Sequence, residues 1–501
     1  MNLKKLILKG GLQLGATQAV SQASIFLRNL IVARIVGPAD FGIASTFAIT
    51  MALLEMVGSL SADKLLIQAE DGDHAHLQGV AQLMLVGRGL MAGLVVFCCA
   101  GLVSDLFGAP GAAWAFRCLA LVPVVRGLIH LDMYRIQREM NFGAAALVDM
   151  IANLAGVVAA WPVAAFLRDY SAMLWLIVGQ ALITALASHR MARRRYTVCW
   201  HWTYASRVFD FGWPLMINSV LMFIIFQGDR FVIGSAGRLF HAHLYSLEDL
   251  GGYSVALALT LSPCLLIGSI SSTLMLPLLS RCRNDRSEFS RQYAMSAEIL
   301  ALVCGVVAVP MVAAGGWLVT VMYGARYTAG VEVIGWLAAA QAVRIIRVTP
   351  TLVAMANGDT KNGMISNIFR SISLPVTLLL ASRFAPLWML AAVGFGGECV
   401  ALFVSLWRVR QKFNLPFSLT LKPAVITGVA IALSGISYMT LRQLHPALEP
   451  ACAIVITSML VCAMLLNFSC LRASVQFLFA EIFRFTRGRS VLSNFERTIT
   501  L

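Results

Sequence analysis

Runs of about 20 apolar residues recur along the chain, and no other feature constrains its fold as strongly. A helix of that length crosses roughly 30 Å of hydrocarbon. Only 13% of the residues are charged, whereas a soluble protein carries about a quarter. A transmembrane β-barrel is excluded, because its strands alternate apolar and polar residues over about ten positions. The chain is therefore predicted to be an all-α polytopic membrane protein.

We expect about fourteen membrane-spanning helices, one for each apolar run long enough to cross. An even count places both termini on the same side of the membrane. The predicted spans are 10–36, 41–62, 79–104, 112–131, 143–166, 172–188, 211–235, 252–276, 297–322, 331–355, 363–383, 386–407, 423–442 and 450–470.

Basic residues gather in alternate connections, and the positive-inside rule assigns those connections to the cytoplasm. Both termini are therefore predicted to be cytoplasmic. The same distribution accounts for the net charge of +15 without a nucleic-acid partner. The connections assigned to the cytoplasm hold Lys4, Lys5, Lys9, Arg135, Arg138, Arg190, Arg193, Arg194, Arg195, Arg281, Arg283, Arg286, Arg291, Arg408, Arg410, Lys412, Arg484, Arg487 and Arg489. The opposite connections hold only Arg168, Arg238, Arg326, Arg383 and Arg442.

The widest cytoplasmic connection, from His189 to Asp210, divides the chain. We expect a six-helix lobe over residues 1–200, a second over 201–410, two further helices over 411–470 and a cytoplasmic or interfacial tail over 471–501. The tail is too polar to span, and its Phe and Arg residues suit a helix lying in the interface.

The first helices of the two lobes are expected to be equivalent. QASIFLRNLIVARIVGPADFGIA (22–44) and FIIFQGDRFVIGSAG (223–237) each carry charge inside an apolar run. In each case a glycine lies at the start of the next helix, Gly42 in the first and Gly251 in the second. Internal repeats of this kind are common in transporters, with the substrate site between the lobes.

Charged side chains within hydrocarbon are costly and mark pathways, substrate sites or partners. Arg28 lies on a polar stripe of the first helix, about three turns from the second, and is a candidate to line a cavity. Arg34 lies near the end of that helix and can reach the outer interface. The stripe consists of Thr17, Ser21 and Ser24, with Gln18 and Gln22 beside it as further cavity candidates.

Asp229 and Arg230 are adjacent in the seventh span, so they cannot share a helix face. Either each is stabilised by a different neighbouring helix, or one faces the cavity. Arg344 and Arg347, at i and i+3, share a face and form either a two-pronged phosphate clamp or a pair that snorkels toward cytoplasmic headgroups.

Arg370 is a further cavity candidate. It lies on the span next to that of Glu398, so these two residues are also suited to pair with each other. A carboxylate at membrane depth can bind a proton or sodium ion that powers a transport cycle, or simply pair with an arginine. The candidates for ion coupling are Glu55, Asp149, Asp229 and Glu398; further buried arginines are Arg88 and Arg126.

Several segments, in order, carry a family resemblance: VARIVGPADFGIAS (32–45), YRIQREMNF (134–142), FGWPLMINS (211–219) with GDRFVIG (228–234), and VTVMYGARYTAG (319–330) with AMANGDTKN (354–362). Together they resemble the Wzx-type polysaccharide flippases of the MOP (multidrug/oligosaccharidyl-lipid/polysaccharide) exporter superfamily. The resemblance implies two six-helix bundles in a V around a central cavity, plus two C-terminal helices.

The same resemblance implies a location in the bacterial inner membrane and a substrate, undecaprenyl-pyrophosphate-linked oligosaccharide. The substrate would move to the outer leaflet by alternating access, for exopolysaccharide, capsule or O-antigen synthesis. Membrane lipids, a polysaccharide polymerase and export machinery are the implied partners.

Three alternatives stay open: a peptidoglycan-precursor flippase, an exporter of cationic drugs, and a membrane polymerase or transferase. A drug exporter should have an acidic cavity, whereas the intramembrane charges here are mainly arginine. A polymerase would show a long extramembrane loop or a catalytic carboxylate motif. The sequence has no GxxxxGK[ST], CxxC or HExxH, so we expect no enzyme activity, no catalytic residue, no metal and no cofactor, with coupling to a proton or sodium gradient.

Overall fold

The computed structural model describes residues 3–58, 62–138, 143–240, 245–444, 448–468 and 472. The predicted tail, 471–501, lies outside the described residues apart from Arg472. Within the described ranges every regular element is a helix, which confirms the all-α fold class. The helices of residues 1–200 are α1 (Leu3–Ile35), α2 (Pro38–Gly58), α3 (Ala62–Gln68), α4 (Ala75–Leu106), the short 3-10 helix η1 (Pro110–Ala112), α5 (Ala113–Leu119), α6 (Leu121–Gly127), α7 (Asp132–Gln137), α8 (Gly143–Leu167) and α9 (Ser171–Met191).

The remaining helices begin with α10, which is 39 residues long. They are α10 (Trp202–Phe240), α11 (Leu247–Cys282), α12 (Arg286–Ala313), α13 (Gly315–Tyr323), α14 (Thr328–Ala356), α15 (Lys361–Ser371), α16 (Ser373–Ser382), α17 (Leu387–Phe413), α18 (Ser418–Leu444) and α19 (Glu449–Asn467).

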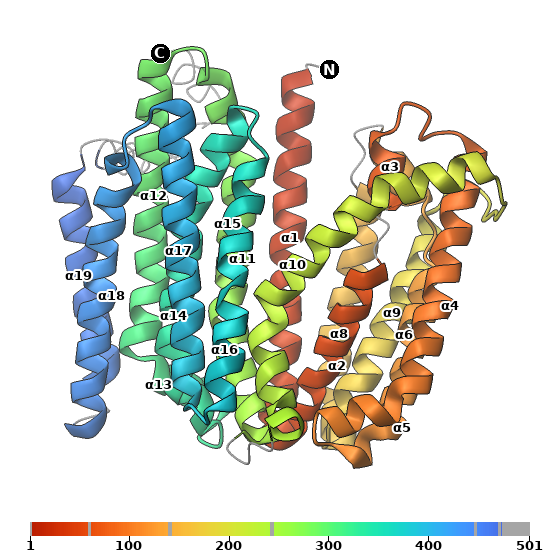
Figure 1. Ribbon diagram of the computed structural model, residues 1–501, viewed down its shortest axis with the longest axis horizontal. Coiled ribbons are helices and arrows are strands. Elements are labelled where there is room, and N and C mark those ends of the chain that lie inside the picture. The colour runs from red at the N-terminus through yellow and green to blue at the C-terminus, as the bar shows by residue number, and fades with distance from the viewer. Residues whose placement is uncertain are drawn as a thin grey trace, which may run out of the picture.

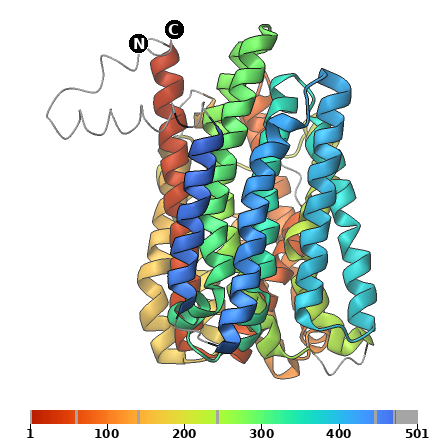
Figure 2. The ribbon, with the colours of Figure 1, turned by 90° about the vertical axis from the view of Figure 1, so that its left-hand side faces the viewer.

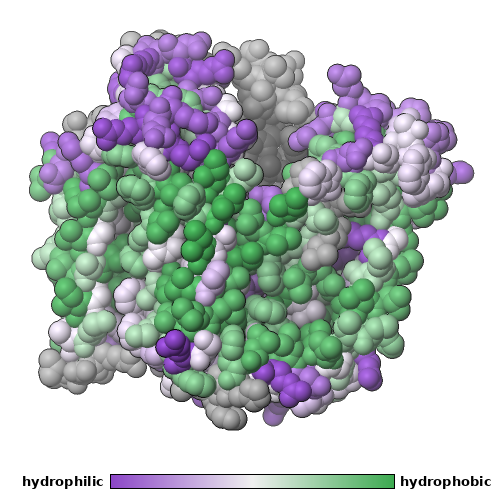
Figure 3. Space-filling view, in the orientation of Figure 1, coloured by the Kyte–Doolittle hydropathy of each residue, from purple (hydrophilic) through white to green (hydrophobic). Residues whose placement is uncertain are grey.

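Twelve helices of the described chain are long and apolar enough to cross a membrane. Two further spans are predicted from the sequence. The span 10–36 corresponds to α1, whose apolar run is interrupted by polar residues, and the span 112–131 corresponds to the shorter helices α5 and α6. The chain is a multi-pass membrane protein, and its surface shows a broad apolar belt between hydrophilic ends (Figure 3). The count of about fourteen spans stays a prediction.

Three predicted spans are interrupted, and a proline or a pair of glycines lies close to each break. α5 ends at Leu119, four residues before Pro123, and α15 ends at Ser371, four residues before Pro375. Proline removes a backbone N–H and its ring clashes with the carbonyl four residues earlier. The span predicted over 297–322 divides between α12 and α13 at Ala314, just before two glycines.

The helices form two groups that meet at one end and diverge toward the other (Figure 1). α4 to α9 lie in one group and α11 to α17 in the other, while α10 crosses between them and packs on α2, α4, α15 and α16. α18 and α19 pack on α12 at the far edge (Figures 1 and 2). The division at residues 200 and 410 stays a prediction; below, the first lobe means residues 1–200 and the second lobe 201–410.

The end that carries α3 and α7 is the predicted cytoplasmic end, and it holds a buried carboxylate. Asp132 accepts a hydrogen bond from Arg135 Nε at 2.6 Å and from the backbone N–H groups of Arg193 and Arg194 at 2.7 and 3.1 Å. Arg194 also contacts Asp73 at 2.9 Å. These contacts tie the connection after α9 to α7 and to the loop before α4.

Asp132→Asn is expected to lower the free energy of unfolding by about 2–3 kcal/mol, because it weakens charge-assisted hydrogen bonds to a fully buried group. Burial raises the pKa of Asp132, but Arg135 and the two backbone N–H groups hold the pKa below its ordinary value. A lowered folded pKa means that the stabilisation is fully present above the unfolded pKa of about 3.9 and is lost as the pH falls through the folded pKa.

Thermal unfolding of the wild type and of Asp132→Asn from about pH 2 to pH 8 measures this effect, because the loss occurs below the unfolded pKa of about 3.9. The difference in melting temperature should be constant at neutral pH and should narrow at the acid end. Asp105→Asn, on an exposed residue of α4, is the control. A difference that grew on acidification would contradict the assignment.

Candidate functional site

The two lobes close on each other at the predicted outer end, where the starts of α2 and α11 touch through glycine. A Cβ on Gly42 would lie 1.9 Å from the carbonyl oxygen of Leu247, and a Cβ on Gly251 would lie 2.0 Å from that of Pro38. Only glycine permits such an approach of two backbones. The glycines that mark the sequence repeat are therefore the points at which the lobes meet.

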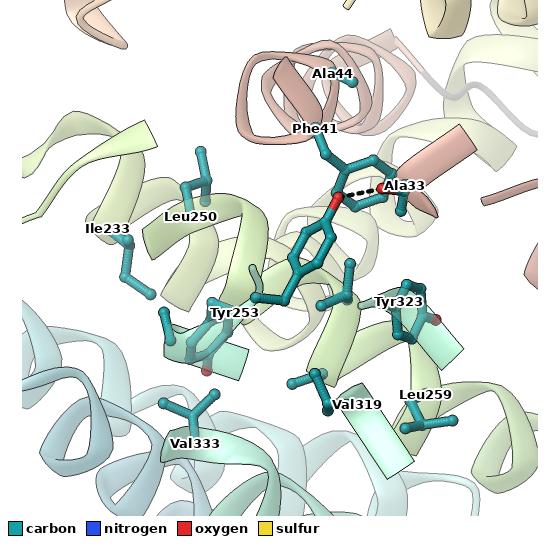
Figure 4. Close-up of a cluster of buried hydrophobic side chains, with 14 of the residues drawn as sticks. Ala33, Phe41, Ala44, Ile233, Leu250, Tyr253, Leu259, Val319, Tyr323 and Val333 are labelled. Atoms are coloured by element: carbon teal, nitrogen blue, oxygen red, sulfur yellow. Dashed lines mark hydrogen bonds between the residues drawn. The ribbon is translucent and has the colours of Figure 1, made fainter. Parts of the chain in front are cut away.

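An apolar cluster surrounds this crossing and takes residues from both lobes (Figure 4). Phe41 of α2 packs edge-to-face on Tyr327, whose hydroxyl donates to the carbonyl oxygen of Ala33 at 2.5 Å. Arg34 donates to the carbonyl oxygens of Val321 and Met322 at 2.7 and 3.0 Å. Arg34 of the first lobe thus satisfies backbone carbonyls of α13 in the second lobe. We call the apolar cluster together with these hydrogen bonds the outer contact.

Arg28 lies on α1 and faces α8 and α9 of its own lobe. Its Nη1 donates to Gln180, and Gln180 in turn donates to Asn153 at 2.8 Å. The side chain passes Gly156, where a Cβ would lie 3.6 Å from Arg28 Cδ. Of the flanking amides on α1, Gln18 is exposed and Gln22 is half-buried.

Glu398 of α17 is fully buried and is shared by three arginines. Its Oε1 accepts from Arg344 Nε at 2.7 Å and from Arg370 Nε at 2.5 Å, and its Oε2 lies 3.4 Å from Arg347 Nη2. The predicted Arg370–Glu398 pair is confirmed. Arg344 and Arg347 do share a face, but they are about 11% exposed, so they do not snorkel to headgroups.

This cluster, which we call the Glu398 cluster, joins four helices. Arg347 also donates to Ser366 and Asn367 on α15 at 3.2 and 3.0 Å. Arg370 donates to the carbonyl oxygen of Ile225 on α10 at 2.9 Å, and the Arg344 guanidinium lies 4.8 Å from the Phe226 ring. Three cations around one carboxylate leave an excess of positive charge in the membrane interior.

Asp229 and Arg230 take different partners. Tyr253 of α11 donates to Asp229 Oδ2 at 3.1 Å, whereas Arg230 donates to Gln227 one turn earlier on its own helix. Asp229 also lines a small cavity of about 20 Å³ with Arg344 and Arg370. Because Tyr253 belongs to the outer contact, one phenol joins that contact to the charged interior of the second lobe.

The two remaining coupling candidates lie in the first lobe. Glu55 forms an ion pair with Arg126, and Asp149 is exposed on α8 near its predicted cytoplasmic end. Sequence reasoning missed Tyr253, Gln180 and Asn153. Gln180 and Asn153 could have been found as amides inside predicted spans, whereas Tyr253 carries no such signal.

Comparison with known proteins relates the chain to polysaccharide biosynthesis. A family model described as "Polysaccharide biosynthesis protein" matches residues 31–332. The succinoglycan biosynthesis transport protein ExoT of Rhizobium meliloti is 25% identical over 64% of this chain and 63% of its own length. The lipopolysaccharide biosynthesis protein WzxC of Escherichia coli is 20% identical over 71% of each chain.

Two solved structures share the fold. A lipid II flippase MurJ in an inward closed conformation matches 92% of this chain and 99% of its own at a TM-score of 0.70 and 13% identity. An inward-facing multidrug resistance MATE family transporter of the MOP superfamily matches 80% of this chain and 96% of its own, at a TM-score of 0.61 and 13% identity. At this identity the likeness establishes the fold alone.

Proposed function

The chain belongs to the polysaccharide biosynthesis protein family, and from that premise we propose that it is a lipid-linked oligosaccharide flippase rather than an enzyme. The substrate would be an oligosaccharide on undecaprenyl pyrophosphate, moved from the inner to the outer leaflet for exopolysaccharide, capsule or O-antigen synthesis. ExoT and WzxC, by their names, serve succinoglycan transport and lipopolysaccharide biosynthesis. The observation that carries the proposal is the outer contact, which closes one end while the helix groups diverge at the other.

Sugar hydroxyls and a diphosphate cannot cross hydrocarbon unsatisfied. A flippase needs cationic and amide groups at membrane depth for the head of the lipid, and it must expose them to one side at a time. Arg28 with Gln180 and Asn153 in the first lobe, and the Glu398 cluster in the second, supply such groups. The excess of arginine suits an anionic substrate and argues against a cationic drug.

A clamp by Arg344 and Arg347 on phosphate would require Glu398 to be displaced, because that carboxylate holds both guanidiniums. We therefore assign the first substrate contacts to Arg28, Gln18 and Gln22. For coupling to a proton or sodium gradient, Asp229 is the preferred candidate. One hydroxyl hydrogen bond holds Asp229, whereas three arginines hold Glu398.

Arg28→Ala is expected to slow flipping at least about tenfold, the loss expected when one charge-assisted hydrogen bond to substrate is removed. The protein should still reach the membrane, since Arg28 is only partly buried. Arg383→Ala, on an exposed arginine of the predicted outer end, is the control. Near-normal flipping by Arg28→Ala would remove Arg28 from the substrate path.

The function itself is tested in spheroplasts of cells that make the lipid-linked oligosaccharide. With the protein present, the sugar should become accessible to a membrane-impermeant oxidant at the outer face; without it, the sugar should accumulate out of reach. Equal accessibility in both cells would contradict the proposal. Longer glycan chains formed by the purified protein would favour the polymerase alternative.

A further inference from the structure

A second cavity, of about 440 Å³, lies between the first lobe and α10, and none of the residues assigned above as substrate contacts lines it. Its volume falls within the range of small-ligand sites. Residues of α2, α3, α4, α6, α7 and α10 form its walls. The apolar lining includes Met51, Leu54, Met84, Leu85, Pro123 and Met222.

Four charged residues also line this cavity, and their signs balance. Arg126 pairs with Glu55, and Arg88 Nη2 donates to the backbone carbonyl oxygen of Glu55 at 3.3 Å. Asp63, in the first turn of α3, is the second acid. Within the described residues no carboxylate lies in ion-pair range of Arg88, so its remaining donors are available to an anion.

The cavity opens toward lipid and not only toward the protein interior. The side chains of Arg126 and Glu55 are 41% and 44% exposed, whereas Glu398 is fully buried. Figure 3 shows hydrophilic surface inside the apolar belt of the first lobe, between α10 and α4. An exposed ion pair at this depth costs free energy unless a polar group covers it.

The cavity begins at the predicted cytoplasmic interface, where the headgroups of that leaflet lie, and extends inward. Glu55 lies three residues before the end of α2, and Tyr134 of the short helix α7 lines the same space. Arg88 lies thirteen residues into α4, or about 20 Å at 1.5 Å per residue. The polar groups therefore reach from the interface to near the middle of a hydrocarbon core of roughly 30 Å.

We propose that this cavity binds a zwitterionic phospholipid whose headgroup carries both a phosphate and a primary ammonium, with its chains leaving between α4 and α10. Arg88 and Arg126 take the phosphate, and Asp63 takes the ammonium. The methionine and leucine walls cover the first carbons of the chains, since unbranched Met adapts to irregular apolar shapes. The site goes beyond the proposed function, because its balanced charge does not match a diphosphate-linked sugar.

Native mass spectrometry of the whole purified protein tests the site, with phosphatidylethanolamine, phosphatidylglycerol and phosphatidylcholine of identical chains as probes. Phosphatidylethanolamine should bind about tenfold more tightly than either of the others, because only it offers both a phosphate and ammonium donors. Arg88→Gln should weaken its binding about tenfold, and Asp63→Asn should remove its advantage over phosphatidylglycerol. Arg117→Gln, on an exposed residue in the last turn of α5, should change nothing.

A variant that keeps every charged residue tests whether weaker lipid binding by the charge variants could come from misfolding. Ala92 lines the cavity, and Ala92→Trp should fill it and abolish the tight binding. Equal binding of the three lipids, or unchanged binding by Arg88→Gln, would overturn the proposal. Displacement of phosphatidylethanolamine by an equal concentration of undecaprenyl diphosphate would also overturn it and would assign the cavity to the lipid-linked substrate.

Discussion

Gly251→Val is expected to reduce flipping by one to two orders of magnitude, because the outer contact can no longer close. The new Cβ would meet the Pro38 carbonyl oxygen at 2.0 Å and the Gly42 backbone nitrogen at 3.1 Å. Both are backbone atoms, so the helices α2 and α11 must move apart. Overpacking of this kind costs about 1–3 kcal/mol or more, which corresponds to about a tenfold to hundredfold change in the population of the closed state.

Gly268→Val is the matched control, since Gly268 lies on the same helix and a Cβ there would meet no atom within 4 Å. Both variants introduce the same β-branched residue into α11, so any common loss of helix propensity cancels. Flipping in vesicles measures transport. Chemical labelling of a cysteine introduced at Val319, a buried residue of the outer contact, measures whether that contact closes. Unchanged flipping and labelling in Gly251→Val would show that the contact does not gate the path.

Glu398→Gln is expected to destabilise the second lobe by about 3–5 kcal/mol, the usual cost of removing one partner from a buried ion pair. Arg344, Arg347 and Arg370 would be left without their common carboxylate. Thermal unfolding in detergent measures the loss. Glu332→Gln, on an exposed residue of α14, should leave the melting temperature within about a degree, as surface changes typically do.

A further variant separates a structural role of Glu398 from a role in ion coupling. Replacing Glu398, Arg344, Arg347 and Arg370 together by methionine removes the charges of both signs, and apolar replacement of a complete buried network is often tolerated. Recovered stability without recovered flipping would make the cluster part of the transport path. Recovery of both would make it structural. A Glu398→Gln protein as stable as the wild type would contradict the ion-pair account.

The fold class and most helix positions followed from the apolar runs, because hydrocarbon forces each crossing segment to satisfy its own backbone. The interruptions at Leu119 and Ser371 lie four residues before Pro123 and Pro375. Proline alone would not have placed them, because Pro263 and Pro350 lie inside the unbroken helices α11 and α14. The division of α12 from α13 was less predictable, since an adjacent pair of glycines does not by itself end a helix.

The site was predicted unevenly, and helix rotation is the reason. Pairing of Arg370 with Glu398 followed from their adjacent spans, but the recruitment of Arg344 and Arg347 depends on how α14 is turned toward α17. Arg34 was expected at the lipid interface, yet its position beside α13 gives it carbonyl partners in the other lobe.

Gly42 and Gly251 entered the sequence argument as a sign of repetition and proved to be partners across the lobes. A repeat in sequence indicates equivalent positions but not that those positions touch. Contact between them depends on how the two lobes are placed against each other, which no local pattern records.

Transfer of a lipid-linked oligosaccharide between leaflets by the purified protein tests the central claim most directly. Vesicles would carry an undecaprenyl-pyrophosphate oligosaccharide with a fluorescent sugar, and a membrane-impermeant reductant would quench only the label in the outer leaflet. Vesicles with the protein should lose nearly all of their fluorescence, and vesicles without it should retain the inner-leaflet share. Retention of that share in the presence of the wild-type protein, under a proton or sodium gradient of either direction, would contradict the account.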